Sequence, residues 1–233
     1  MRQPPDEGSA GADPDAPDRA SDRALEAALA DKTALLHEVD HRVKNNLQLI
    51  ASLILLQSRR TADENARMAL KTVLERVTAV ATVHRRLFQG DPLRFDVADF
   101  VRDLAGDLAA AAGRNDLTIA LELDPVAIPA SAAAPFALVV NELLGNSLKH
   151  AFPAGRAGRI RVALSNGGER CRLTVSDDGV GRQGQPAGFG STIVQLLCQQ
   201  LHAELDISDA QPGVLAVVTV PMSLPATPLR TTP

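Results

Sequence analysis

Apolar residues recur at helical spacing over the first third of the chain. Between residues 35 and 60 this seam comprises Leu36, Val39, Val43, Leu47, Ile50, Leu53 and Ile54. Steps of three and four predict an amphipathic helix that begins at an N-cap, Ser21 or Asp22, and runs to about Arg59. After a turn, a second helix is predicted to end near Gln89, with its seam at Ala66, Leu70, Val73, Val77, Val80, His84 and Leu87.

The two seams match, so we expect an antiparallel helical hairpin over residues 23–90. One hairpin leaves much of its apolar stripe exposed to water. We therefore expect a homodimer in which two hairpins form a four-helix bundle.

The pattern changes after Gly90, where short strands alternate with helices over residues 91–222. Helices are predicted at residues 97–112, 131–152 and 190–201. Strands are predicted near residue 94, at 117–124, as a pair at 159–166 and 171–177, and as two closing strands. This mixture predicts an α/β sandwich, so the fold class of the whole chain is α+β. The Pro-containing ends, 1–22 and 223–233, are expected to be a disordered and a flexible tail.

Composition narrows the possible functions. The formal charge is −4, which disfavours nucleic-acid binding through a general basic surface. No apolar run approaches the ~20 residues of a membrane span, and no signal peptide opens the chain. The two cysteines, Cys171 and Cys198, form no motif and are expected to be buried thiols in a reducing compartment. We expect a cytoplasmic protein.

One histidine has no packing role in the first helix. His41 lies opposite the apolar seam and shares its face with Glu38, Asn45 and Gln48, which are three, four and seven residues away. A histidine on the solvent face, surrounded by polar side chains, is available to react or to bind.

Three motifs in the second half point to a nucleotide. In VVNELLGNSLKHAF, Glu142 and Asn146 lie one helical turn apart, and Lys149 and His150 follow. A carboxylate, an amide oxygen and a cation at this spacing can position a nucleophile, coordinate Mg²⁺ and neutralise phosphate oxygens.

The other two motifs are rich in glycine. In SDDGVG, Asp177 closes a strand, and Gly179 and Gly181 let the backbone approach a flat ligand. In GFGST, Gly188 and Gly190 open a helix whose N-terminal amides can hold an anion. Neither a Walker A loop nor a Rossmann fingerprint is present.

The order of these three motifs resembles the Bergerat-type ATP-binding domain of the GHKL superfamily. HRVKNNLQLIASLILLQSR resembles the dimerisation and phospho-acceptor helix of sensor histidine kinases of the second HisKA type, relatives of the HWE kinases. The resemblance covers roughly residues 24–221.

The resemblance implies a protein-histidine kinase that uses Mg·ATP. It implies that His41 accepts the phosphoryl group and passes it to an aspartate of a response regulator receiver domain. The residues it implies for binding ATP are Asn146 as Mg²⁺ ligand, Asp177 at the adenine amino group, Lys149 at phosphate, His150 at the pocket edge, and Gly179, Gly181, Gly188, Gly190 and Ser191 around the pocket and its lid.

Three roles stay open. Glu142 is assigned either acid/base chemistry or a place in the Mg²⁺ shell. In the commonest pattern of histidine kinases an acidic residue follows the acceptor histidine, but here Arg42 does. Asp40 or Glu38 is therefore expected to take the proton, and helical geometry favours Glu38. Asn45 either orients water for removal of phosphate from the partner or is an ordinary exposed polar residue.

Two other functions are weighed. HEVDH, residues 37–41, matches the HExxH zinc template, with His84 as a conceivable third ligand, which would make the protein a zinc hydrolase. A phosphotransfer adapter would instead relay phosphate through His41 without binding ATP, but such relatives lose the nucleotide motifs. The N-terminal segment is too short and polar for a sensor domain, so a separate sensor protein is one expected source of the signal.

Overall fold

The computed structural model describes residues 16–89, 91, 93–182 and 189–223. Predictions for residues 1–15 and 224–233, and for Gly188, lie outside this range. The chain divides between Asn45 and Asn46 into two compact units, and the second contains the end of the first helix and everything after it.

The first helix, α1 (Ala16–Arg60), starts earlier than predicted. The prediction placed its N-cap at Ser21 or Asp22 and assigned residues 1–22 to a disordered tail, which is wrong for residues 16–22. Pro17 is compatible with this start, because proline is tolerated in the first helical turn, where its missing N–H would have no helical partner.

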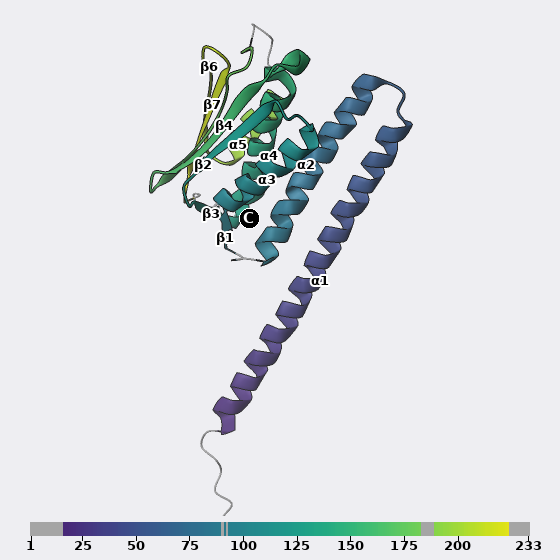
Figure 1. The fold of residues 1–233 in the computed structure, drawn as a ribbon. Helices are drawn as coiled ribbons and strands as arrows, with labels where there is room; N and C mark the ends of the chain where they lie inside the picture. Colours follow the sequence, from purple (N-terminus) through teal and green to yellow (C-terminus); the bar gives the residue numbers. More distant parts are fainter. Residues whose placement is uncertain (1–15, 90, 92, 183–188, 224–233) are drawn as a thin grey trace, which may run out of the picture. The chain divides into compact units, whose positions relative to one another are not determined.

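The second helix, α2 (Glu64–Gln89), ends where the sequence predicted. The chain reverses over residues 61–63 (Figure 1). Asp63 is the N-cap of α2: its Oδ1 accepts the backbone N–H of Ala66 at 2.7 Å. That hydrogen bond satisfies one of the amides that a helix start leaves unpaired.

The rest of the chain is a two-layer sandwich (Figure 1). Its sheet has the order β2-β4-β5-β7-β6, in which β2 and β4 are parallel and the other neighbours antiparallel. These strands are β2 (Leu117–Leu123), β4 (Gly158–Asn166), β5 (Arg170–Asp177), β6 (Glu204–Asp209) and β7 (Val214–Pro221). The helices are α3 (Val97–Ala112), α4 (Ala130–Asn146) and α5 (Phe189–Gln200). The α+β class is thereby confirmed.

A small sheet was only half predicted. Strand β1 (Arg94–Asp96) was expected, but its antiparallel partner β3 (Ala127–Pro129) was not. Three residues are too few to show the alternation by which a strand is recognised.

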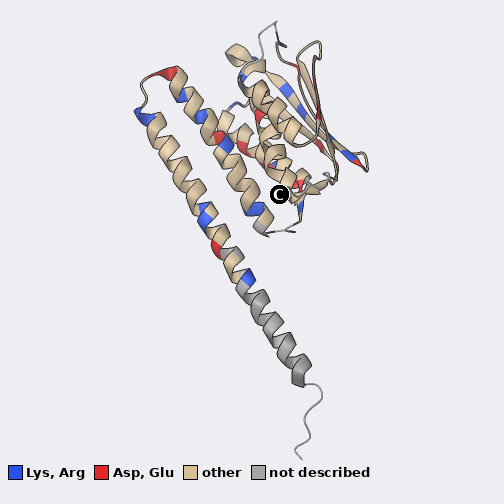
Figure 2. Ribbon diagram, turned by 180° about the vertical axis from the view of Figure 1, so that it is seen from behind, with Lys and Arg blue, Asp and Glu red and all other residues tan. Residues whose placement is uncertain are grey.

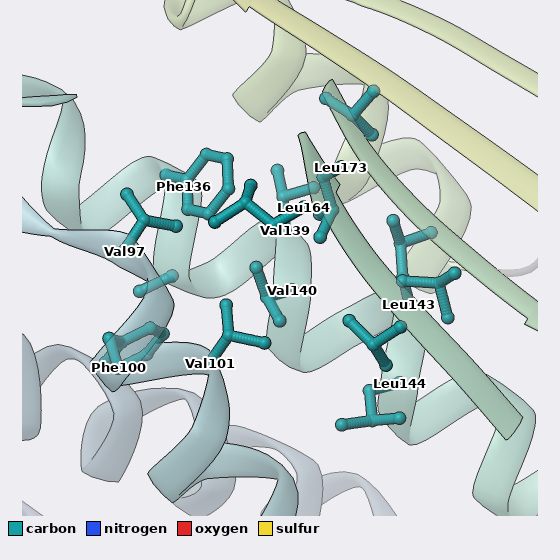
Figure 3. Close-up of a cluster of buried hydrophobic side chains, with 14 of the residues drawn as sticks. Val97, Phe100, Val101, Phe136, Val139, Val140, Leu143, Leu144, Leu164 and Leu173 are labelled. Carbon is teal, nitrogen blue, oxygen red and sulfur yellow. The ribbon is translucent and has the colours of Figure 1, made fainter. Parts of the chain in front are cut away.

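The core lies between the large sheet and the helices. Ile160, Val162 and Leu164 alternate along β4 with residues that are exposed or half-buried, as expected for a sheet with one buried face. Val139 and Val140 of α4 point into the same cluster (Figure 3). Apolar burial on this scale is the main stabilising contribution to the fold.

Helix α4 ends sooner than predicted. The sequence indicated one helix over residues 131–152, but the α-helix stops at Asn146 and a π-helical turn, η1 (Ser147–Ala151), follows. A short 3₁₀ turn, η2 (Pro153–Gly155), completes the segment. π-Turns are frequent at functional sites, and this one carries predicted nucleotide-binding residues.

Helix α2 packs against α4 and β1. Ala79 and Val83 are its buried residues, at 3% and 1% exposure, and Val83 belongs to the sandwich core. The seam predicted for α2 includes Val73, which is 40% exposed. The sequence paired that seam with the first helix. In the described residues the buried side chains of α2 belong instead to a neighbouring column, which faces the sandwich.

Of the helices in the described part of the chain, none combines the length and the apolar content that a membrane crossing requires.

The two thiols are buried, as predicted, and unpaired. Burial raises the pKa of Cys198 to about 11 and raises the pKa of Cys171 above its ordinary value. Both therefore stay protonated near pH 8, and we expect iodoacetamide to label neither in the native protein and both in denaturant. Mass spectrometry of quenched samples measures this.

The same shifts make stability depend on pH. A folded pKa above the unfolded one gives a stabilising contribution that is complete below about pH 8.5 and is lost as pH rises through the folded value. Denaturant midpoints should thus fall above pH 9. Native labelling at the rate of the unfolded chain would contradict the burial of both thiols.

Candidate active site

The predicted phospho-acceptor is exposed on α1. The Asn45 side-chain amide lies 3.1 Å from Nδ1 of His41, one helical turn away. The ring therefore projects to solvent, as its position opposite the seam predicted. Nδ1 has a side-chain partner in Asn45, which leaves Nε2 as the other ring nitrogen for chemistry.

The acidic residue favoured to assist His41 has another partner. Glu38 Oε1 accepts hydrogen bonds from Arg42 Nε at 3.0 Å and from Arg42 Nη2 at 2.5 Å. Both side chains are largely exposed, so this pair is weak and can open. The side chain of Asp40 lies outside the described part of the structure, and the choice between Glu38 and Asp40 remains a prediction.

The residues predicted to hold Mg²⁺ and phosphate line one cavity of about 310 Å³. This volume is at the low end of the roughly 300–1,000 Å³ of ligand sites. Its lining comes from four elements: α4 and η1 carry Asn141, Glu142, Asn146, Lys149 and His150, α5 carries Gly190, and α2 carries Glu75 and Arg76.

Glu142 is buried and paired. Its side chain is 5% exposed, and its two oxygens accept hydrogen bonds from Arg76 Nε at 2.7 Å and Nη2 at 2.9 Å. The hydrogen bond to Glu142 is the main cause that raises the pKa of Arg76, with burial opposing it. Sequence reasoning missed Arg76, because the two residues are separated by 66 positions and no local pattern connects them.

Gly190 allows α5 to approach Glu142 and Asn146. A Cβ at residue 190 would lie 3.1 Å from Glu142 Oε2 and 3.5 Å from Asn146 Oδ1. Carboxylate and amide oxygens are ligands that Mg²⁺ accepts, so Glu142 and Asn146 fit the ion by type. Ser191 follows in the first turn of α5.

The π-turn directs its residues differently. Ser147 is buried and donates to Asp177 Oδ2 at 2.9 Å, whereas Lys149 Nζ donates to Glu75 Oε2 at 2.7 Å. His150 is exposed at the cavity edge, as predicted.

Asp177 is buried at the end of β5, with 6% exposure. Besides Ser147, its carboxylate accepts the backbone N–H groups of Gly179 at 3.1 Å and Val214 at 3.2 Å. An ionised carboxylate has about four lone-pair sites, so about one remains for a donor such as the adenine amino group. Asp177 therefore fits its predicted role.

Glycines make this end of the site possible. A Cβ at Gly179 would lie 2.4 Å from the carbonyl oxygen of Ala151, and Gly181 has φ +72°. Gly213, which the sequence did not single out, has φ +95°, and a Cβ there would lie 1.7 Å from the backbone oxygen of Asp177. Only glycine fits at this approach of two segments.

The zinc-hydrolase alternative gains no support from the described residues. Within the residues the structure describes, no group of three or more His, Cys, Asp or Glu could hold a metal ion. The side chain of His37 lies outside them, so the HEVDH alternative rests on its motif alone.

Comparisons with known proteins match both halves of the chain. Residues 38–112 match the HisKA_2 family model, described as a histidine kinase. Residues 132–225 match the model of the histidine kinase-, DNA gyrase B- and HSP90-like ATPases.

Similar proteins are named as histidine kinases as well. The sensor histidine kinase PdtaS of Mycolicibacterium smegmatis is 33% identical over 82% of this chain and 40% of its own length. The blue-light-activated histidine kinase 2 of Erythrobacter litoralis is 30% identical over 90% of this chain and 60% of its own. The chain thus spans about half the length of these relatives.

A solved structure agrees. The histidine kinase domain of a blue-light-activated histidine kinase from Erythrobacter litoralis superposes with a TM-score of 0.60 at 27% identity, over 80% of this chain and 90% of that one. The chain belongs to the histidine kinases of the HisKA_2 type.

Proposed function

We propose that the protein autophosphorylates His41 from Mg·ATP and passes the phosphoryl group to an aspartate of a response regulator receiver domain. The observation that carries the proposal is that one ATPase-type sandwich brings Glu142, Asn146 and Lys149 to one cavity. The match to the HisKA_2 family and the exposed ring of His41 support this histidine as the phosphoryl acceptor.

In this reaction Nε2 of His41 is the nucleophile. The ring must be neutral, with its proton on Nδ1. The structure places Asn45 Nδ2 against Nδ1, so this tautomer needs the amide flipped, which brings the amide oxygen to accept the Nδ1 proton. A bond forms between Nε2 and the γ-phosphorus while the bond from that phosphorus to the ADP oxygen breaks. The Nδ1 proton then leaves to a base, for which we propose Glu38 or Asp40.

The sandwich binds and orients the nucleotide. Asp177 accepts the adenine amino group, Lys149 neutralises phosphate, and Asn146 holds Mg²⁺. Glu142 joins the Mg²⁺ shell, or acts as an acid or base, only when its pair with Arg76 opens. Bound Mg²⁺ supplies charge neutralisation across the phosphates. Catalysis is then mostly positioning and electrostatic stabilisation.

The acceptor helix also offers a dimer interface. Apolar residues of α1 are exposed, among them Val39 at 52%, Leu49 at 62%, Ile50 at 43% and Leu53 at 58%. A stripe of this kind on a single chain marks an interaction surface. We propose that a second copy of α1 covers it in a homodimer.

Incubation with ATP labelled at the γ-phosphate tests the kinase. We expect acid-labile label on the wild type, none on His41→Ala because the nucleophile is gone, and at least about tenfold less on Asn146→Ala because a metal ligand is lost. His202→Asn is the matched control: it removes an exposed histidine with φ +50°, which Asn tolerates, and should label normally.

Label that survives His41→Ala would place the acceptor elsewhere. A wild-type protein that takes no label from ATP, but accepts and relays phosphate from another phosphorylated protein, would show the adapter function instead.

Light scattering after size-exclusion chromatography tests the dimer. The wild type should elute with twice the chain mass of 24.6 kDa. Leu53→Lys should elute at the monomer mass, because a charge would be buried in the interface. Leu93→Lys, at a residue that is 77% exposed and outside the helices, should stay dimeric. A wild-type monomer at micromolar concentration would contradict this interface.

A further inference from the structure

Helix α2 supplies two consecutive charged side chains to the cavity of the nucleotide site. Glu75 accepts a hydrogen bond from Lys149 Nζ at 2.7 Å, and Arg76 binds both oxygens of Glu142. Charged residues of both signs lie along α2 and on the neighbouring part of the sandwich (Figure 2). Two residues assigned to Mg²⁺ and phosphate therefore already have protein partners.

Two sets of interactions hold α2 against the nucleotide site. The Arg76–Glu142 pair is bidentate and mostly buried, with side-chain exposures of 16% and 5%, and two parallel bonds fix its geometry. One and two turns further along α2, Ala79 and Val83 are buried against the sandwich. Glu75 is thereby tethered beside Lys149, which gives its carboxylate a high effective concentration there.

The Glu75–Lys149 pair is more open. The side chains are 25% and 34% exposed, so water and solutes reach the pair. An ammonium group has three donors and could bond to a second anion. That anion would lie beside the Glu75 carboxylate, however, and like charges at such range repel.

We propose that Glu75 is an internal competitor of nucleotide phosphate for Lys149, and so sets the affinity of the site for ATP. The inference rests on the proposed function, which places phosphate at Lys149. Nucleotide phosphate binds Lys149 by displacing Glu75. By linkage, bound nucleotide weakens the docking of α2 on α4 as much as that docking weakens nucleotide binding.

The test is the substitution Glu75→Gln, which keeps the shape of the side chain and removes its charge. Calorimetric titration with Mg·ATP should show binding about two- to fivefold tighter than wild type, the range that a partly exposed ion pair contributes. Adenosine has no phosphate to reach Lys149, and in competition against a fluorescent ATP analogue its affinity should be unchanged.

Glu64→Gln is the matched control. It lies on the same helix, makes the same change in net charge and removes an exposed pair with Arg67 outside the cavity. It should bind Mg·ATP as the wild type does. Glu75→Asp keeps the charge on a shorter side chain and should fall between wild type and Glu75→Gln.

An unchanged or weaker affinity of Glu75→Gln for Mg·ATP, with wild type binding normally, overturns the inference alone. Equal tightening for ATP and adenosine also overturns it, since the cause would then be a general opening of the cavity. A wild type that binds no Mg·ATP overturns the proposed function and this inference with it.

Discussion

Burial of α4 on nearly all sides is the constraint on which the rest of the structure depends. The helix packs against α2, α3 and α5, and its side chains complete the core above the sheet. The helix is accordingly apolar over most of its length, and Val139, Val140 and Leu144 are fully buried. A helix in this position can carry polar chemistry only where it meets a cavity or a charged partner.

Near the end of α4, the buried carboxylate of Glu142 has such a charged partner. Glu142 is almost as buried as the apolar residues beside it, and a lone carboxylate there would be costly to keep ionised. Arg76 removes the cost by bonding to both oxygens. Loss of one partner from such a pair typically destabilises a protein by about 3–5 kcal/mol, so α2 is needed to complete this part of the sandwich.

The opposite situation holds on α1. His41 and its neighbours are solvated, their hydrogen bonds span single turns of one helix, and each contributes little to stability. Such a surface suits the role proposed for His41, which requires contact first with a nucleotide and then with a partner protein. The tightly packed residues thus lie on α4, whereas the solvent-accessible histidine lies on α1.

The sequence by itself determined whatever depends on local spacing. The helix over residues 97–112 was predicted from the sequence, and α3 has these bounds. Its ends are set locally, because the Asp96 side chain caps the first turn and Gly113 adopts a left-handed conformation after the last. The outward position of His41 follows from the same helical geometry. Gly179 and Asp177 were found because they are two residues apart in one motif.

Tertiary structure decided what joins distant segments. Arg76 bonds to Glu142, 66 positions away, and Glu75 bonds to Lys149, 74 positions away. Gly213, in the connection between β6 and β7, packs closely against the backbone of Asp177. The π-turn that separates Ser147 from Lys149 was also hidden, because its sequence suits an α-helix equally well. Helical periodicity gives the face on which a side chain lies, and only the packed fold gives its partner.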